Sequence, residues 1–299
     1  MNIVEQWFKS QNWEVQAFQK QCWKAYSQGK SGMLHAPTGS GKTYALWGGI
    51  VEEMSRSKIL PKGLHALWIT PLRALGVEIQ NATQKMISDI NPELQVGLRT
   101  ADTPQSQRTK LLKTPPFGLV TTPESVHVLL GNKEHQKYFK QLRVVVVDEW
   151  HELLGSKRGV QVELALVYLR SIIPNLRVWG ISATLGNKEL AREILLGPTD
   201  NFTVVEAKIQ KKIRVQSLLP KTMERFPWRG HLGTQLLPQV LKIIKKNKST
   251  LIFTNTRAQC EIWFHRLLEE APNLAGSIAM HHGSIDKNIR MWVEVSSRK

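Results

Sequence analysis

Short runs of apolar residues alternate along this chain with longer segments in which apolar residues recur every three or four positions. The short runs fit buried strands and the longer segments fit amphipathic helices, and their alternation is typical of βαβ units that build a parallel sheet. The run 144–147 consists of four valines, as expected for a central strand that helices cover on both faces. Strands are predicted at 33–35, 64–70, 117–121, 142–147 and 176–182, and helices at 42–56, 73–90, 160–173 and 188–196.

The alternation stops between residues 197 and 230, where prolines and a basic segment occur, and then resumes. About 70 residues are fewer than an α/β domain usually needs to be stable alone, so we expect the second domain to be partial. Its pattern predicts helices at 236–246 and 258–270 and strands at 251–254 and 277–281. The predicted organisation is a first α/β domain over 1–205, a crossing segment over 206–230 and a partial second domain over 231–299.

The composition is that of a globular protein outside the membrane. Of the 299 residues, 41% are hydrophobic and 22% are charged, which excludes disorder throughout. No stretch approaches the roughly 18 uncharged apolar residues that span a bilayer, and the first residues contain no apolar signal-peptide core, so we expect a cytoplasmic protein with no membrane partner. Cys22 and Cys260 lie far apart without CxxC spacing, so neither a disulfide framework nor a cysteine zinc site is expected.

Basic residues outnumber acidic ones by 41 to 24, which gives a formal net charge of +17. The excess is concentrated toward the C-terminus, because residues 206–299 carry 17 basic and 7 acidic side chains whereas residues 1–205 carry 24 and 17. A polyanionic partner such as nucleic acid would explain this excess, and so would a solvated basic face. Charge alone leaves both interpretations open.

The strongest chemical signal is a glycine-rich octapeptide between the predicted strand 33–35 and the predicted helix 42–56. Its glycines let the backbone amides fold around a phosphate, and the start of the helix adds a positive dipole. Lys42 would reach the β- and γ-phosphate oxygens of ATP, and Thr43 would offer its hydroxyl to Mg²⁺. A glycine-rich turn without a ligand is the alternative, which the strand–loop–helix context disfavours. The octapeptide consists of Ala36, Pro37, Thr38, Gly39, Ser40, Gly41, Lys42 and Thr43.

An acidic pair, Asp148 and Glu149, follows the valine strand, where it would lie at the carboxyl edge of the sheet beside the glycine-rich loop. Asp148 would hold Mg²⁺ through a water molecule, and Glu149 would orient and deprotonate the water that attacks the γ-phosphate. Alone, such a pair is more often a cap for the following helix. Together with the glycine-rich loop it predicts an ATP-hydrolysing site whose catalytic residues are Lys42, Asp148 and Glu149.

These motifs together resemble those of superfamily 2 helicases. The octapeptide looks like motif I, the DEWH segment 148–151 like motif II and the SAT segment 182–184 like motif III, in the order of that family. The stretches 148–166 and 178–187 are similar to the ligase-associated, Lhr-like DEXH-box helicases of bacteria. The resemblance covers nearly the whole chain and implies a RecA-like P-loop NTPase domain, a parallel sheet with helices on both faces, followed by a partial second RecA-like domain.

The resemblance also assigns residues to adenine, to coupling and to nucleic acid. Gln19 matches the glutamine that reads adenine, and His151, Ser182 and Thr184 match residues that link the γ-phosphate to movement of the second domain. Outside the motif order, Ser182 and Thr184 would suit a helix cap, and threonines at strand ends would reflect strand propensity. The residues that match contacts to a nucleic-acid strand are Thr70, Arg73, Arg99, Thr100, Thr121, Thr122, Thr254, Arg257 and His282.

The function that the resemblance implies is an ATP- and Mg²⁺-dependent DNA helicase that moves 3′ to 5′ in DNA repair. Its substrate would be single-stranded DNA or a duplex with a 3′ tail, and its repair partner a DNA ligase or nuclease. The arginine-bearing motif VI of the family has no match within residues 1–299, and an arginine finger is worth about 10³ to 10⁵ in rate, so we expect binding of ATP and nucleic acid with little turnover. A non-enzymatic ATP- and nucleic-acid-binding fragment and an RNA helicase are the alternatives that the residues leave open.

Overall fold

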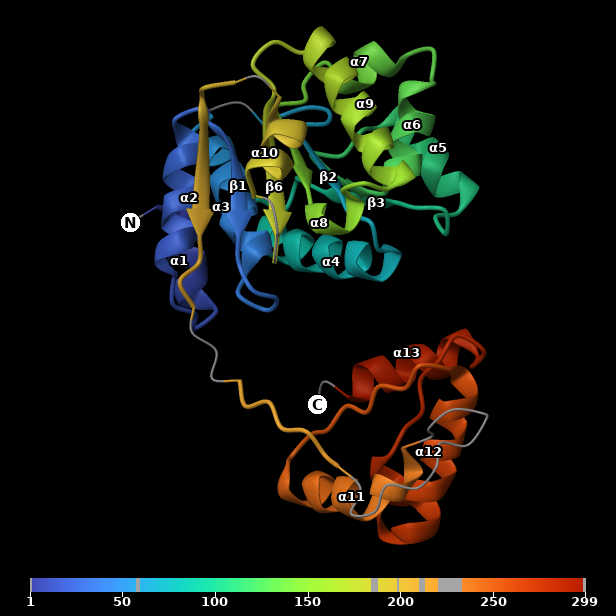
Figure 1. Cartoon of the computed structure of the whole chain (residues 1–299). Helices are drawn as coiled ribbons and strands as arrows, with labels where there is room; N and C mark the ends of the chain where they lie inside the picture. The colour runs from blue at the N-terminus through green and yellow to red at the C-terminus, as the bar shows by residue number, and fades with distance from the viewer. Residues whose placement is uncertain are drawn as a thin grey trace. The chain divides into compact units, whose positions relative to one another are not determined.

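The chain forms two compact units, Met1–Lys211 and Lys212–Lys299, whose boundary falls within the predicted crossing segment 206–230. Figure 1 shows the helices and strands of both units. The computed structural model describes residues 2–57, 60–183, 188–197, 199–209, 213–219 and 233–297.

The first unit is built on a parallel sheet, as the sequence predicts. Neighbouring strands are parallel in every pair, and 66–69 lie in register with 118–121 on one side and with 144–147 on the other. The carboxyl ends of the strands therefore meet at one edge, which is where ligands bind in such sheets. Across the sheet, the seven strands of the described residues are β3 (Val96–Arg99), β4 (Gly118–Thr121), β2 (Ala66–Ile69), β5 (Val144–Val147), β6 (Arg177–Ser182), β1 (Ser31–His35) and β7 (Phe202–Glu206).

Five of these strands are the predicted ones, and the two that the sequence pattern missed, β3 and β7, are the edges of the sheet. Every residue of β2, β4, β5 and β6 is buried, because helices cover both faces there. The edge strands expose part of their residues and mix apolar side chains with glycine, arginine, threonine and glutamate. They therefore lack the continuous apolar run by which a central parallel strand can be recognised.

Helices cover both faces of the sheet (Figure 1). The valines of β5 show this most simply, because Val144 and Val146 belong to one hydrophobic cluster and Val145 and Val147 to the other. The helices of the first cluster are α1 (Ile3–Ser10), α2 (Ala17–Ser27), α3 (Lys42–Ser55) and α4 (Arg73–Ile90). Those of the second cluster are α5 (Gln105–Lys113), α6 (Pro123–Leu130), α7 (His135–Phe139), α8 (Trp150–Leu153), α9 (Lys157–Ile172) and α10 (Lys188–Leu196).

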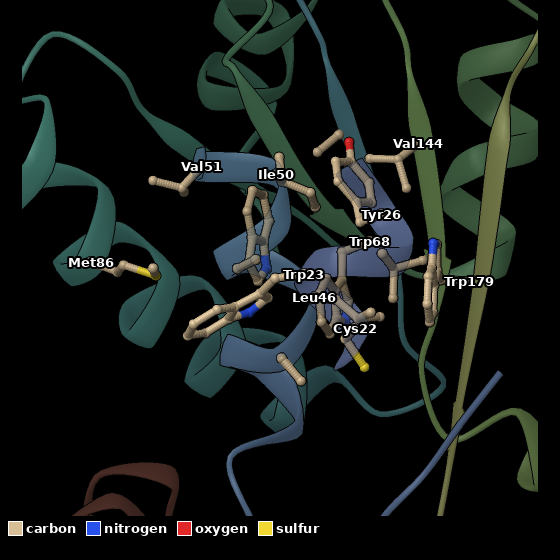
Figure 2. Packing of buried hydrophobic residues seen from close by; sticks show 14 of the residues in the cluster. Cys22, Trp23, Tyr26, Leu46, Ile50, Val51, Trp68, Met86, Val144 and Trp179 are labelled. Carbon is tan, nitrogen blue, oxygen red and sulfur yellow. The ribbon is translucent and has the colours of Figure 1, made fainter. Parts of the chain in front are cut away.

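Tryptophans fill much of the first cluster. Trp47 and Trp68 are fully buried, and their rings stack with centroids 5.8 Å apart and planes inclined by 4°. Figure 2 shows Trp68 and Trp179 among the packed side chains of this cluster. The ring of Trp47 occupies the space in which a Cβ at Gly118 would lie. The close approach of the indole to β4 therefore requires glycine at position 118.

The second unit is helical over its described residues, and two predicted strands are wrong. Neither 251–254 nor 277–281 forms a strand in the structure. A strand needs a hydrogen-bonded neighbour, and the described residues of this unit provide none, so that Leu251 and Phe253 remain exposed. The predicted helices correspond to α11 and α12. The elements are η1 (Thr234–Leu236), α11 (Leu237–Lys246), α12 (Arg257–Glu270), η2 (Pro272–Ser277) and α13 (Lys287–Ser296).

Candidate nucleotide site and nucleic-acid interface

The glycine-rich loop joins β1 to α3 and adopts a conformation that glycine permits. Gly39 and Gly41 have φ angles of +75° and +86°, in the left-handed region that other residues disfavour. Gly41 is also the N-cap residue of α3, and no side-chain hydrogen bond caps that helix. The first amides of α3, together with the helix dipole, can therefore bind a phosphate group.

Gln19 of α2 lies against this loop and is almost fully buried. Its Nε2 donates a hydrogen bond to the Gly41 carbonyl oxygen at 3.2 Å, and its Oε1 accepts one from the Gln16 amide at 2.9 Å. Both ends of the side-chain amide are thus fixed, and a Cβ at Gly41 would collide with Nε2. The structure places Gln19 beside the phosphate loop, and its contact with adenine stays a prediction.

The helix-starting lysine and the acidic pair meet in the structure. Lys42 Nζ lies 3.1 Å from Glu149 Oε1, and both side chains are largely buried. Glu149 has a φ angle of +46°, which is uncommon for a residue with a side chain and common at functional sites. The backbone therefore turns sharply after β5 and aims this carboxylate at the phosphate loop.

Asp148 is the more deeply buried of the two carboxylates. It accepts hydrogen bonds from Trp68 Nε1 at 3.3 Å and from the Glu149 amide at 2.9 Å. Burial, with the charge of Glu149 as a second cause, raises the pKa of Asp148 to about 6, although Lys42 acts to lower it. A cation beside this carboxylate would favour its charged form.

The donor set fits Mg²⁺ better than a transition metal. The described residues contain no group of three His, Cys, Asp or Glu side chains that would form a protein cage for a metal. Mg²⁺ is commonly held by one or two oxygen ligands of the protein together with water and substrate phosphate. The Asp148 carboxylate and the Thr43 hydroxyl, which follows Lys42 at the start of α3, supply such oxygens.

The third motif is tied to the first two. The Ser182 hydroxyl lies 3.1 Å from His151 Nδ1, and the same nitrogen lies 3.5 Å from Glu149 Oε2. The Ser182 carbonyl oxygen accepts a hydrogen bond from the Ala36 amide at 3.1 Å. The structure thus connects His151 and Ser182 to both parts of the nucleotide site, whereas Thr184 lies outside the described residues.

Polar residues gather at the carboxyl ends of β3, β4 and β2, which are adjacent strands. Arg99 and Ile69 both pair in register with Thr121, so the positions after them lie side by side. The Thr121 hydroxyl donates to the Arg99 carbonyl oxygen at 2.8 Å, which ties two of these ends together. The predicted strand-binding residues at this edge are Thr70, Arg99, Thr100, Thr121 and Thr122, and all five are buried.

The two predicted arginine contacts differ in their surroundings. Arg73 is exposed at the start of α4, and its Nη1 donates to Asp102 Oδ1 at 3.0 Å. Arg99 is buried, its Nη1 has no hydrogen-bond partner within the described residues, and burial lowers its pKa. Arg73 is therefore the one of the two whose charge faces solvent, where a phosphate group could displace Asp102.

The remaining predicted residues belong to the second unit. Arg257 Nη1 donates to Ser284 Oγ at 2.6 Å, which joins the start of α12 to the segment 281–284. Thr254 Oγ1 donates to the Thr256 carbonyl oxygen at 3.2 Å, and His282 Nε2 lies 3.4 Å from Glu261 Oε1. Within this unit the predicted residues come from neighbouring segments, and their contact with nucleic acid stays a prediction.

Comparison with known proteins identifies the family. Residues 16–192 match the family model for DEAD/DEAH box helicases, a span that includes the phosphate loop, the acidic pair and Ser182. The chain belongs to the DEAD/DEAH box helicase family. This helicase is 31% identical to the ATP-dependent helicase Lhr-Core of Sulfolobus acidocaldarius, over 97% of the chain and 35% of that relative. It is 27% identical to the Lhr helicase/uracil glycosylase of Escherichia coli K12, over 96% of the chain and 23% of that relative.

Solved helicase structures share the fold of the whole chain. The helicase Lhr of Mycobacterium smegmatis, bound to ssDNA and AMP-PNP, matches 99% of this helicase and 40% of its own chain, with a TM-score of 0.78 and 27% identity. Mss116p, bound to ssRNA and AMP-PNP, matches 98% with a TM-score of 0.75, and at 19% identity it shows the fold alone. The chain spans about a third of the length of its Lhr-Core relatives. None of the helices in the described ranges combines the length and apolar character that crossing a bilayer requires.

Two residues at the site of this helicase were missed in the sequence. Trp68 reads as one more apolar residue of a predicted strand, and only the structure shows its indole donating to Asp148. Arg158 lies within the stretch 148–166 that resembles Lhr-like helicases, but nothing in its spacing reveals its partners. Both act through side-chain contacts between segments about 30 to 90 residues apart, which periodicity does not report.

Proposed function

We propose that this protein is the ATP-hydrolysing motor part of a DNA helicase that moves 3′ to 5′ along single-stranded DNA. One observation carries the proposal: Lys42 forms an ion pair with Glu149, next to Asp148. Lys42 is also the first residue of α3, whose first amides are not capped by a side chain. This combination suits a nucleotide with a γ-phosphate, which needs a cation, a metal ligand and a base at one place. An Lhr helicase that this chain resembles is described as bound to ssDNA and AMP-PNP, which supports DNA as the polymer.

Nucleotide binding would begin with an exchange of partners at Lys42. In the structure, the ammonium group of Lys42 is held by Glu149. A β,γ-phosphate group that lies on the amides of residues 39–43 would compete for Lys42 with a larger negative charge. Glu149 would then be released from its ion pair. Its carboxylate, aimed at the same place by the turn after β5, could accept the proton of the attacking water.

Thr43 and Asp148 would hold Mg²⁺. When bound, Mg²⁺ supplies positive charge that offsets the charge developing on the phosphate oxygens. Asp148 is well prepared for this role, because Trp68 and the Glu149 amide orient its two oxygens. The raised pKa of Asp148 means that this carboxyl group retains a proton more readily than an exposed one would.

His151 and Ser182 would link the occupancy of the nucleotide site to movement of the rest of the motor. Their side chains touch, and His151 is also close to Glu149, so that release of Glu149 from Lys42 alters the surroundings of His151. Together with Thr184, they match residues that link the γ-phosphate to domain movement in superfamily 2 helicases. The nucleic-acid strand itself would lie over the carboxyl ends of β2, β3 and β4, where the backbone amides of the following loops can donate to its phosphates.

The wider role that we propose is DNA repair in the cytoplasm, on single-stranded DNA or a duplex with a 3′ tail, with a DNA ligase or nuclease as partner. Residues 1–299 by themselves should bind ATP and nucleic acid with little turnover, as the sequence leads us to expect. Thr254, Arg257 and His282 of the second unit would add contacts to the strand.

The experiment that tests this function is a comparison of ATP hydrolysis without polymer, with single-stranded DNA and with single-stranded RNA, in wild type and Lys42→Ala. ATP and strand binding are measured on the same samples. We expect DNA to bind and to raise whatever turnover is present, and Lys42→Ala to abolish ATP binding. Stimulation by RNA alone would contradict DNA as the polymer, and unchanged ATP binding by Lys42→Ala would contradict the assignment of the phosphate loop.

A further inference from the structure

The loop that follows β2 and the first turn of α6, which follows β4, are joined by one side chain, that of Arg158 at the start of α9. Its Nη1 donates a hydrogen bond to the Pro71 carbonyl oxygen at 2.8 Å. Its Nε and Nη2 donate to the two carboxylate oxygens of Glu124, at 2.6 and 3.3 Å. Pro71 follows Thr70, and Glu124 lies two residues after Thr122, so the partners of Arg158 sit immediately beside predicted strand contacts.

The geometry of this contact distinguishes it from an ordinary surface ion pair. An exposed pair contributes little unless it is bidentate, and here the fork of the guanidinium grips both oxygens of Glu124. Partial burial acts to raise the pKa of Glu124, but the hydrogen bonds that it accepts from Arg158, from its own amide and from Thr122, together with the charge of Arg158, leave the pKa below its ordinary value. Glu124 is thus ionised at neutral pH. A lysine at position 158 could not reproduce the planar fork.

The backbone beneath Arg158 is fixed as well. The Ser156 hydroxyl accepts from the Gly159 amide at 3.1 Å and lies 2.7 Å from the Leu153 carbonyl oxygen, to which it donates. A Cβ at Gly159 would collide with that same carbonyl, so the turn between α8 and α9 is tightly closed. Because α8 starts directly after Glu149, the chain segment that carries Arg158 begins at the nucleotide site.

We propose that Arg158 is a positioning residue for nucleic-acid binding, which ties Pro71, after β2, to Glu124 in the first turn of α6, after β4. This inference rests on the proposed function. The Thr70 amide donates to the Thr121 carbonyl oxygen at 2.9 Å, so the strand ends are already joined, and Arg158 extends that connection by one to three residues. With Arg158 in place, the donors around Thr70 and Thr122 face successive phosphates of one strand. Without it, the strand ends stay paired, but Pro71 and the start of α6 lose their common partner. Arg158 acts through Pro71 and Glu124 and does not touch the strand.

The test is the affinity of the full chain for a labelled oligothymidylate, measured by fluorescence anisotropy in Arg158→Gln, Arg158→Lys and Glu124→Gln. We expect Arg158→Gln to weaken binding about tenfold, which corresponds to about 1.4 kcal/mol. Arg158→Lys should fall between Arg158→Gln and wild type. Glu124→Gln should weaken binding, and the double variant should lose no more than Arg158→Gln alone, because both residues act as one unit. Arg56→Gln, which removes an exposed ion pair with Glu52 on α3, is the matched control and should bind as wild type does.

Three further readouts separate positioning from other roles. Affinity for a fluorescent ATP analogue and the melting temperature should stay close to wild type in Arg158→Gln, since the nucleotide site keeps all its contacts. The slope of log affinity against log salt concentration should also be unchanged. Each phosphate that a cation neutralises on a single strand contributes about 0.7 to that slope. A direct contact between Arg158 and phosphate would therefore reduce the slope by about 0.7.

Three outcomes would overturn the inference. The first is DNA affinity of Arg158→Gln equal to that of wild type. The second is the reduced salt slope, which would make Arg158 a phosphate contact. The third is a joint loss of nucleotide affinity, DNA affinity and melting temperature, with no recovery in Arg158→Lys, which would make its role general stability. If wild type binds neither oligothymidylate nor RNA, the proposed function itself fails, and that result is distinct from all three.

Discussion

Asp148→Asn should raise the stability of the first unit relative to wild type more at neutral pH than at pH 4, while it removes a proposed metal ligand. Asp148 is buried, and its pKa is raised from 3.8 to about 6, chiefly by burial and then by the charge of Glu149. A carboxyl group whose pKa rises on folding destabilises the folded state whenever it is ionised. The difference between about 6 and the ordinary value corresponds to about 3 kcal/mol at pH 7.

The effect of the substitution depends on pH. The charged carboxylate lowers the free energy of unfolding of wild type by its full amount above pH 6, and this loss disappears as the pH falls toward 3.8. Asparagine carries no charge, but its single oxygen can accept from only one of the two donors, Trp68 Nε1 and the Glu149 amide, so one hydrogen bond is lost at both pH values, at a cost of about 1 to 3 kcal/mol. The stability of the variant relative to wild type should therefore be about 2 kcal/mol higher at pH 7 than at pH 4.

The assay is denaturant unfolding of both proteins at pH 7 and pH 4, followed by tryptophan fluorescence in buffer with EDTA. Asp102→Asn is the control, because its exposed carboxylate pairs with Arg73 at the surface and should change stability by no more than about 0.5 kcal/mol. A stability difference between Asp148→Asn and wild type that is the same at pH 7 and at pH 4 would refute the reasoning, because ionisation of Asp148 would then contribute nothing to it.

Three further predictions concern the catalytic carboxylate, the adenine contact and the core. Glu149→Gln should retain ATP binding and lower any polymer-stimulated hydrolysis by about a hundredfold or more, and retained hydrolysis would reject its role as base. Gln19→Ala should reduce the preference for ATP over GTP in competition binding, and an unchanged preference would contradict adenine recognition. Gly118→Ala should destabilise the first unit by about 1 to 3 kcal/mol, because the new methyl group overlaps the Trp47 ring. The control Gly131→Ala has ordinary contacts and a φ of −74°, and its melting temperature should stay near that of wild type.

The sequence reveals the centre of the sheet and misses its edges for a physical reason. A strand such as β5 lies between two layers of helices, so both of its faces must be apolar and the run of valines is unmistakable. The edge strand β3 has the sequence VGLR and is only partly covered, so it carries no such run. In the second unit the pattern misled, because the apolar segment 251–254 has the composition of a strand but no neighbour to pair with among the described residues.

The sequence predicts those residues of the candidate site that lie in the phosphate loop or directly after a strand. Lys42, Asp148 and Glu149 follow from a glycine-rich loop before a helix and carboxylates after a buried strand. Their ion pair, the left-handed backbone of Glu149 and the hydrogen bond from Trp68 depend on three-dimensional packing. Arg158 belongs to this second group, since its partners lie 34 and 87 residues away.

Coupling between nucleotide and nucleic acid is tested by the affinity for AMP-PNP and Mg²⁺ with and without saturating single-stranded DNA. We expect DNA to tighten nucleotide binding in wild type, by a factor within the usual range of about 5 to 150 for coupled sites, and we expect Lys42→Ala to bind no nucleotide under either condition. Identical nucleotide affinity with and without DNA would contradict a motor in which the loop around Lys42 and the carboxyl ends of β2, β3 and β4 act together.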